Sequence, residues 1–326
     1  MADNGKLRID AAAEDWRLAQ AFVISRGAKT EARVIVAHIS DGEVCGRGEA
    51  VPYARYGEDV EASLNLIKSC HARSREELQS AMPAGAARNA LDCAFWDFEA
   101  KRAGVAVSEL AGVPEVRPVE TAYTLSLDSP SAMAEQARRV AHLNILKLKL
   151  GADGDAERMR AVRDARPDAR MIIDANEGWA VDALSGLMAV AADVGVELIE
   201  QPLPAGRDNV LSQVQRPVAV CADESALTSS DLGRLVGCYD AVNIKLDKAG
   251  GLTEALTMRD AARAKRFKIM VGSMVATSLA VAPALILAQG ADWVDLDGPL
   301  LLAEDRPHGL AIRDGWVTPA SPDLWG

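Results

Sequence analysis

Three acidic residues stand at the ends of three consecutive apolar segments of this chain. The segments read IIDANEGW, LIEQPLP and CADES, and their acids are Asp174, Glu200 and Asp223. Buried carboxylates repel one another and lose hydration, so such a cluster calls for a cation. A ligand set made only of oxygen atoms suits Mg²⁺. Each acid alone could be the N-cap of a following helix, but the repeat over three segments favours one Mg²⁺ site per subunit.

Lysines occupy matching places in two further segments. Lys147 and Lys149 lie two residues apart in ILKLKLG, and Lys245 lies in VNIKLDKAGG. Because side chains alternate between the two faces of a strand, both ammonium groups of the first pair point the same way. Two solvated lysines on an edge strand are the simpler explanation of the KxK pattern taken alone. Beside one another and beside a cation, the lysines would have lowered pKa values, which would let Lys149 and Lys245 act as bases.

A pair of aspartates closes the last of these segments. In VDLDGP, Asp295 and Asp297 lie two residues apart and therefore on a common face of the expected strand. Two carboxylates placed together need a cation to face. The alternative is a structural ion pair with the C-terminal tail, through Arg306 or Arg313.

The segments that carry these residues follow a regular rhythm of strand and helix. From Thr121 onward, short apolar strands alternate with helical stretches at a spacing of roughly 22 to 27 residues, which is typical of a (β/α)8 barrel. No clear helix follows the eighth strand. In such a barrel the catalytic groups lie at the carboxyl ends of the strands, where the residues above are expected. The expected strands are residues 121–126, 145–150, 171–176, 197–201, 218–223, 241–246, 268–273 and 293–297.

The first 115 residues have a different pattern, which predicts an α+β domain. Antiparallel strands come first and helices follow. The expected elements are strands at residues 22–25, 31–39 and 44–50, a turn at 26–29, and helices at 60–70 and 86–102. We therefore predict one domain over residues 1–115 and a barrel domain over 116–326, with the tail from Leu302 running back over the first domain.

Composition indicates which binding partners and which cellular compartments can be excluded for this protein. A net charge of -11, from 36 Lys and Arg against 47 Asp and Glu, leaves no basic surface for nucleic acid. The longest apolar run, residues 276–288, is broken by Pro283 and falls short of the roughly 20 residues that cross a membrane. Five Cys without a CxxC pair and a polar N-terminus predict a cytoplasmic protein with free thiols. Four scattered His argue against a His-based zinc site, and the sequence is compatible with a homo-oligomer.

These lysines and acids together resemble a known constellation. The chain is similar to the enolase superfamily, in the subgroup of the muconate-lactonising enzymes, and within it to the dipeptide epimerases, above all the bacterial L-Ala-D/L-Glu epimerases. The resemblance covers roughly residues 16–302. It implies a (β/α)7β modified TIM barrel under an N-terminal α+β capping domain, and a small dipeptide as the substrate. The residues and segments that carry it are Lys147, Lys149, Asp174, Glu200, Asp223, Lys245, Asp295, Asp297, PAGAARNALDCAFWD and VNIKLDKAGGLTEAL.

The resemblance implies proton transfer next to a carboxylate. Mg²⁺ would stabilise the enediolate that forms when the α-proton of the C-terminal residue leaves. Strands two and six lie on opposite sides of an eight-stranded barrel, so Lys149 and Lys245 would reach one carbon from opposite faces. One lysine would remove the proton and the other would return one, and this 1,1-proton transfer epimerises the dipeptide. L-Ala-D-Glu and L-Ala-L-Glu are the implied substrates, in murein peptide recycling.

The same resemblance assigns contacts to the substrate. The aspartate pair would bind the free α-ammonium of the dipeptide. Arg26, in the ISRG turn, would bind the side-chain carboxylate of the glutamate, although an exposed surface arginine is the alternative. Thr124, Lys147 and Ser273 are implicated in holding the substrate.

Two other readings stay open. An N-acylamino acid racemase or an o-succinylbenzoate synthase would use the same metal, but its substrate lacks a free ammonium, so the pair of Asp295 and Asp297 argues against it. A barrel that only binds acidic peptides, without catalysis, would have no reason to keep every acid, base and metal position. Proton exchange with solvent would separate such a barrel from an enzyme.

Overall fold

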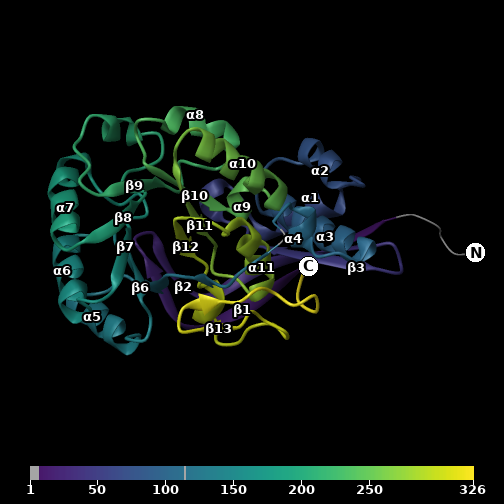
Figure 1. Cartoon of the computed structure of the whole chain (residues 1–326), viewed down its shortest axis with the longest axis horizontal. Coiled ribbons are helices and arrows are strands. Elements are labelled where there is room, and N and C mark those ends of the chain that lie inside the picture. The colour runs from purple at the N-terminus through teal and green to yellow at the C-terminus, as the bar shows by residue number, and fades with distance from the viewer. Residues whose placement is uncertain (1–6, 114) are drawn as a thin grey trace, which may run out of the picture.

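The computed structural model describes residues 7–113 and 115–326, and it begins with a three-stranded antiparallel sheet (Figure 1). Strand β1 (Arg8–Ile24) pairs with β2 (Gly27–Ser40), which pairs with β3 (Cys45–Ala50). The prediction of a strand beginning at residue 22 was too short. Residues 8–21 are rich in alanine and charged side chains, and they form a strand because β2 supplies a hydrogen-bonded partner along most of their length.

The turn between β1 and β2 is also tighter than predicted. Ile24 pairs with Gly27, so the turn contains only Ser25 and Arg26. Such two-residue turns match the twist of antiparallel strands. Arg26 therefore stands at the tip of a long hairpin.

Four helices and one 3₁₀ turn complete the capping part. The long helix α3 packs so closely on β3 that a Cβ atom added to Gly46 or Gly48 would lie 2.3 Å from a carbonyl oxygen of the helix. Glycine at both positions is thus required for this packing. The elements are η1 (Ala54–Tyr56), α1 (Val60–Lys68), α2 (Arg75–Ala81), α3 (Ala86–Ala103) and α4 (Val107–Leu110).

All eight predicted barrel strands are confirmed, and they form one parallel sheet in sequence order. The backbone of Ala122 donates a hydrogen bond to the carbonyl of Val294 at 2.9 Å, which joins the first strand of the sheet to the last. The strands are β5 (Tyr123–Leu125), β6 (Ile145–Lys149), β7 (Arg170–Asp174), β8 (Val196–Glu200), β9 (Ala219–Ala222), β10 (Ala241–Lys245), β11 (Lys268–Gly272) and β12 (Trp293–Asp295).

Helices cover the outside of this barrel. Figure 1 places α5, α6 and α7 on the side away from the capping helices. Among the described residues, no α-helix follows β12 and a 3₁₀ turn stands in its place, so the barrel is of the (β/α)7β kind. No helix of the described residues is long and apolar enough to cross a membrane. The elements are α5 (Pro130–Arg139), α6 (Asp155–Ala165), α7 (Val181–Asp193), η2 (Asp208–Ser212), η3 (Ser229–Asp231), α8 (Leu232–Leu235), α9 (Leu246–Ala249), α10 (Leu252–Ala264), α11 (Ser278–Leu287) and η4 (Gly298–Leu301).

The barrel interior has an apolar floor. Since side chains alternate along a strand, the residue two positions further on from each floor residue also faces inward, nearer the carboxyl end. On β6, β7 and β8 these next positions hold Lys147, Asp174 and Glu200. Below them, the floor is a cluster of Ala122, Ile145, Ile172, Leu198, Cys221, Ala241, Met270 and Trp293.

The C-terminal tail crosses from the barrel to the capping part. Strands β13 (Ile312–Arg313) and β14 (Trp316–Val317) pair with β4 (Val119–Glu120). Further along, the indole of Trp325 donates a hydrogen bond to the carbonyl of Cys93 on α3 at 3.0 Å. The boundary between residues 115 and 116 stays a prediction, and residues 1–6 and 114 lie outside the described residues.

Candidate active site

A cavity of about 930 Å³ lies where the hairpin tip meets the carboxyl ends of the barrel strands. Its wall includes both the capping residues 51–56 and 58–61 and the ends of several strands. Two of the predicted acids, Asp174 and Glu200, are fully buried and contact lysines of this wall. The other predicted site residues all line the cavity: Arg26, Thr124, Lys147, Lys149, Asp223, Lys245, Ser273, Asp295 and Asp297.

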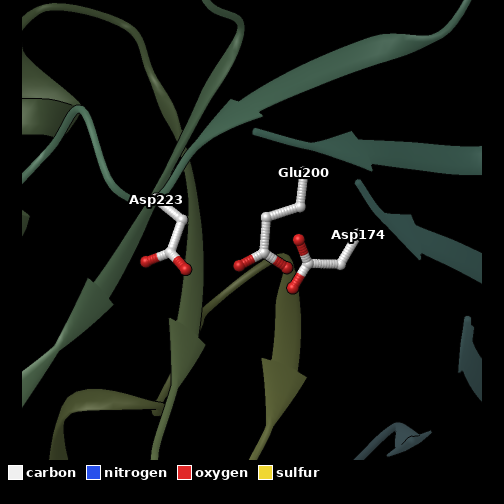
Figure 2. A group of neighbouring side chains, drawn as sticks. All are labelled: Asp174, Glu200 and Asp223. Carbon is white, nitrogen blue, oxygen red and sulfur yellow. The ribbon is translucent and has the colours of Figure 1, made fainter. Parts of the chain in front are cut away.

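The three acids predicted to bind a metal come together. One carboxylate oxygen of each lies within 4.8 Å of the others, and Figure 2 shows Glu200 between Asp174 and Asp223. Asp174 and Glu200 are register partners on β7 and β8, which brings their side chains to one level of the barrel. The buried Oε2 atom of Glu200 accepts no hydrogen bond from the described residues, although Lys147 Nζ lies 2.6 Å away. Three buried carboxylates with one oxygen left over fit a hard divalent cation such as Mg²⁺.

Charge is unevenly balanced among these acids. Burial and the neighbouring Asp174 carboxylate raise the pKa of Glu200 to about 7. Against the effect of burial, the ammonium groups of Lys149 and Lys147 lower the pKa of Asp174 to about 2. A cation held by the cluster would favour the ionised form of Glu200, which the protein alone does not stabilise.

The two predicted bases reach the cluster from opposite strands. Lys149 Nζ on β6 lies 2.6 Å from Asp174 Oδ2, and Lys245 Nζ on β10 lies 2.7 Å from Asp223 Oδ2. The fall in the pKa of Lys245 expected from the sequence depends on the metal and stays a prediction. Although burial opposes its charge, the carboxylates of Asp223 and Glu200 raise its pKa above the ordinary value. A cation on the same carboxylates would oppose that effect.

Lys147 has a different set of partners. Its Nζ atom lies 2.6 Å from Glu200 Oε2 and 2.7 Å from Asp295 Oδ2, and it is 1% exposed. Despite its burial, the carboxylates of Asp295, Glu200 and Asp174 raise its pKa well above the ordinary value. Lys147 therefore stays charged and links the metal cluster to the aspartate pair.

The aspartate pair faces the cavity and not the tail. Asp297 Oδ2 accepts a hydrogen bond from the backbone N–H of Thr124 at 2.7 Å. Burial and the neighbouring Asp295 raise the pKa of Asp297 to about 7. The alternative of an ion pair to the tail is wrong for Arg306, which binds Glu14 and Glu49 instead.

Neither candidate arginine of the tail neutralises the pair. Arg313 is exposed on β13. In the part of the chain that the structure describes, Asp295 pairs with Lys147, whereas Asp297 has no ion pair. The carboxylate of Asp297 is thus available to a cationic group of a ligand.

Arg26 is part of the cavity wall and not a free surface side chain. Its guanidinium donates hydrogen bonds to the carbonyl of Asn176 and to Glu224 Oε1, both at 2.8 Å, and lies 3.3 Å from Glu177. Burial opposes its charge, but contacts with Tyr53 and Glu224 raise its pKa. The hairpin tip is therefore anchored to the ends of β7 and β9.

Three residues with direct contacts to the acids were missed by the sequence reasoning. Asn176 donates hydrogen bonds to both oxygens of Asp174, from its backbone at 2.9 Å and its side chain at 3.1 Å. Asn243 donates a hydrogen bond to Glu200 Oε1 at 2.7 Å, and Lys248 donates one to Asp223 Oδ1 at 2.5 Å. The alternation that places Lys245 inward also places Asn243 inward, so this position could have been found. Lys248 lies on the short helix α9, where strand alternation carries no signal.

The chain matches two family models, which together span most of it. Residues 7–112 match the N-terminal domain of the mandelate racemase and muconate lactonizing enzymes, and residues 132–323 match the enolase C-terminal domain-like family.

Two curated relatives are equally similar in sequence. The L-Ala-D/L-Glu epimerase of Escherichia coli K12 is 44% identical over 309 residues, covering 93% of this chain and 96% of the relative. The N-acetyl-D-glutamate racemase of a Pseudoalteromonas species is 44% identical over 300 residues, covering 90% of this chain and 95% of the relative.

Solved structures agree with these matches. An enolase family member from Agrobacterium tumefaciens with homology to dipeptide epimerases, containing sodium and L-Ala-L-Glu, has a TM-score of 0.97 and 48% identity, with 98% of this chain and all of that chain covered. A dipeptide epimerase from Cytophaga hutchinsonii, complexed with Mg and D-Ala-L-Val, has a TM-score of 0.89 and 25% identity, covering 96% of this chain and 94% of that one. The chain belongs to the mandelate racemase and muconate lactonizing enzyme family of the enolase superfamily.

Proposed function

We propose that this protein is a Mg²⁺-dependent isomerase that epimerises dipeptides at the C-terminal residue, with L-Ala-D/L-Glu as the preferred substrate. The observation that carries the proposal is the pair of lysines, Lys149 on β6 and Lys245 on β10, on either side of a carboxylate cluster in one cavity. Three strands lie between them in either direction around the barrel, so they face each other across it.

The reaction begins with a proton that is hard to remove. Taking the α-proton from a carboxylate adds negative charge to an anion, and Mg²⁺ on Asp174, Glu200 and Asp223 would supply the compensating positive charge. Lys149 and Lys245 each serve one face of the α-carbon. The neutral lysine takes the proton from its face, and the protonated lysine delivers a proton to the other, which inverts the configuration.

Other residues of the cavity hold the two ends of the substrate. Lys147, which stays charged, stands where it can contact the substrate carboxylate. Asp297 has no protein cation and faces the cavity, so it suits the α-ammonium of the dipeptide, with Asp295 beside it. Thr124 fixes Asp297 through its backbone.

The remaining contacts concern the side chain of the second residue. Arg26 would bind its carboxylate from the hairpin tip, and Ser273, directly after β11, lines the same cavity. The L-Ala-L-Glu bound to the Agrobacterium protein supports this choice of substrate.

A second candidate is an N-acylamino acid racemase, of which an N-acetylglutamate racemase is the form that the comparisons favour. A racemase of N-acetyl-D-glutamate is as similar to this chain as the E. coli epimerase is. An N-acyl substrate has an amide in place of the ammonium, and it would leave the charge of Asp297 without a partner. The pKa of about 7 for Asp297 makes its neutral form accessible near neutral pH, and that form could face an amide.

One experiment separates these readings. The protein is incubated with Mg²⁺ in D₂O with either L-Ala-L-Glu or N-acetyl-L-glutamate, and deuterium uptake and configuration are measured by mass spectrometry and chiral chromatography. We expect faster turnover of the dipeptide, and the Asp297→Asn variant should lose activity on the dipeptide more than on the N-acetyl compound. Faster turnover of N-acetyl-L-glutamate would favour the racemase, and no exchange in either would favour a non-catalytic binding barrel.

The proposal extends to the cellular role. A cytoplasmic location and a part in murein peptide recycling are what the family resemblance implies. Cells that lack this protein should then accumulate the Ala-Glu dipeptide, which mass spectrometry of cell extracts would detect. A homo-oligomer would be detected by light scattering of the purified protein.

A further inference from the structure

Two acids of the metal cluster, Glu200 and Asp223, present their two oxygens to different surroundings. In Glu200, Oε1 accepts a hydrogen bond from Asn243 Nδ2 at 2.7 Å, whereas Oε2 accepts none and lies beside Lys147. In Asp223, Oδ1 accepts from Lys248 Nζ at 2.5 Å, whereas Oδ2 lies 2.7 Å from Lys245, which lines the cavity. In Glu200 and Asp223, one oxygen is thus held by a residue that does not line the cavity, and the other lies beside a lysine that does.

Lys248 is fixed by its surroundings. Besides Asp223 Oδ1, its Nζ atom donates to the carbonyls of Asp223 at 2.6 Å and Asn243 at 2.9 Å. An ammonium group has three N–H donors, and these three acceptors use all of them. The side chain is fully buried and does not line the cavity, so it has no donor left for a substrate.

Asn243 occupies a space that is kept open for it. It lies on β10 between Ala241 of the barrel floor and Lys245, and all three side chains face inward. On the adjacent strand β11, Gly272 is the register partner of Lys245, and an added Cβ at Gly272 would lie 2.8 Å from Asn243 Oδ1 and 3.1 Å from Lys245 Cε. The absence of a side chain at Gly272 therefore leaves room for the Asn243 amide to reach Glu200.

We propose that Asn243 and Lys248 are positioning residues of the metal centre. They hold Glu200 Oε1 and Asp223 Oδ1, which would leave the other oxygen of each carboxylate for a divalent cation. Both come from the segment NIKLDK, which also carries Lys245. The inference rests on the proposed function only in requiring that the three acids bind a divalent cation, and it does not depend on epimerisation.

The direction of the effect distinguishes positioning from simple charge. Lys248 is a cation close to the metal centre, so if its charge were all that mattered, removing it would tighten cation binding. If it orients Asp223, removing it lets the carboxylate turn, and binding weakens. Loss of an outer contact to a metal ligand typically weakens metal binding by about 10- to 100-fold.

The test measures cation binding without any substrate. The dissociation constants of Mg²⁺, by calorimetry, and of Mn²⁺, by electron paramagnetic resonance, are compared for the full-length protein and its Lys248→Met and Asn243→Leu variants. We expect each constant to rise by about 10- to 100-fold. Lys265→Met, which removes an exposed lysine after α10, is the matched control and should bind as the unchanged protein does.

Thermal unfolding in EDTA shows whether each variant is folded before metal is added. If Lys248→Met does not fold, Lys248→Gln, which keeps a donor, and Asn243→Leu decide the question. Folded variants that bind Mg²⁺ as tightly as the unchanged protein, or more tightly, overturn the proposal, as does an unchanged protein that binds no divalent cation. Weakened binding in the variants alongside an unchanged protein that exchanges no substrate proton would sustain this inference while refuting the proposed function.

Discussion

The two-base reaction predicts that Lys149 and Lys245 can be separated by isotope exchange. Replacing Lys245 with Met keeps the length of the side chain and removes the proton-transferring group. Asp223 would still be bound by Lys248, through its Oδ1 atom at 2.5 Å and its carbonyl at 2.6 Å, so we expect the fold to survive the change. Replacing Lys149 with Met leaves Asp174 with Lys147 at 3.4 Å.

The expected loss of epimerisation rate in each variant follows from the role of the lysine as a general base. Loss of such a group typically slows a reaction by about 10²- to 10⁴-fold. At about 1.36 kcal/mol for each factor of ten, this corresponds to about 2.7 to 5.4 kcal/mol of activation free energy. Epimerisation needs both faces, so each single variant should lose at least this much in kcat/KM for the conversion of either epimer.

Exchange of the α-proton with solvent should be retained for one epimer in each variant, and this epimer should differ between the two variants. In D₂O, the Lys245→Met protein still has Lys149, which can remove the α-proton of one epimer and return deuterium to the same face. That epimer should gain one deuterium without inverting, whereas the other epimer should not exchange. The Lys149→Met protein should show the opposite preference.

The assay combines mass spectrometry with chiral chromatography of each pure epimer, and Lys265→Met serves as the control for loss of a lysine. Normal epimerisation by Lys245→Met would refute the two-base reaction. Labelling of the same epimer by both variants would refute the assignment of one lysine to each face.

Three further predictions concern the metal, the specificity and the stability. Removal of divalent cations with EDTA should abolish epimerisation, and added Mg²⁺ should restore it. The Glu200→Gln variant should stay inactive at any Mg²⁺ concentration. Full activity in EDTA would contradict the metal requirement. Arg26→Ala should lower kcat/KM for L-Ala-L-Glu by at least tenfold, which corresponds to about 1.4 kcal/mol. The loss for L-Ala-L-Val should be much smaller, because only glutamate has a side-chain carboxylate that Arg26 can bind. Equal losses for the two dipeptides would contradict this role of Arg26. Burial raises the pKa of Asp247 from 3.8 to about 7, although hydrogen bonds from Val51 and Asn89 oppose this rise. Between pH 3.8 and about 7 the folded protein therefore binds more protons than the unfolded chain. The stabilising contribution of the protonated Asp247 is lost as the pH rises through this range. A difference of about three pH units between the pKa values of the folded and unfolded states corresponds to roughly 4 kcal/mol of unfolding free energy at most. The free energy of unfolding by urea should therefore fall more steeply from pH 4 to 8 for the unchanged protein than for Asp247→Asn. Parallel curves of unfolding free energy against pH would contradict this prediction.

The order of the barrel strands could be predicted from the regular succession of strand and helix, and their inward faces from the alternation of side chains along each strand. Strand β6 shows this most simply, since Ile145, Lys147 and Lys149 lie at two-residue intervals and must share one face. The same reasoning carries Asp174 and Glu200 to one level of the barrel, where they are register partners. Carboxylates that recur at the same point of successive strands therefore indicated a cation site without any knowledge of distances.

The capping part required the tertiary structure. Strand β1 begins at Arg8 because β2 pairs with it, and nothing in the apolar pattern of residues 8–21 predicts that partner. Arg26 could be read as a surface residue until packing brought it to the carbonyl of Asn176, 150 positions further along the chain.

Charge pairing inside the barrel was likewise decided only by packing. Lys147 on β6 contacts Asp295 on β12, and Lys248 reaches Asp223 from a helix. Contacts of this kind join elements that are distant in the chain, so they depend on how strands and helices pack and not on the period of any one segment. The sequence therefore identified which acidic and basic side chains make up the site. Their contact partners followed only from the three-dimensional arrangement. Those partners raise the pKa of Lys245 and leave the carboxylate of Asp297 free.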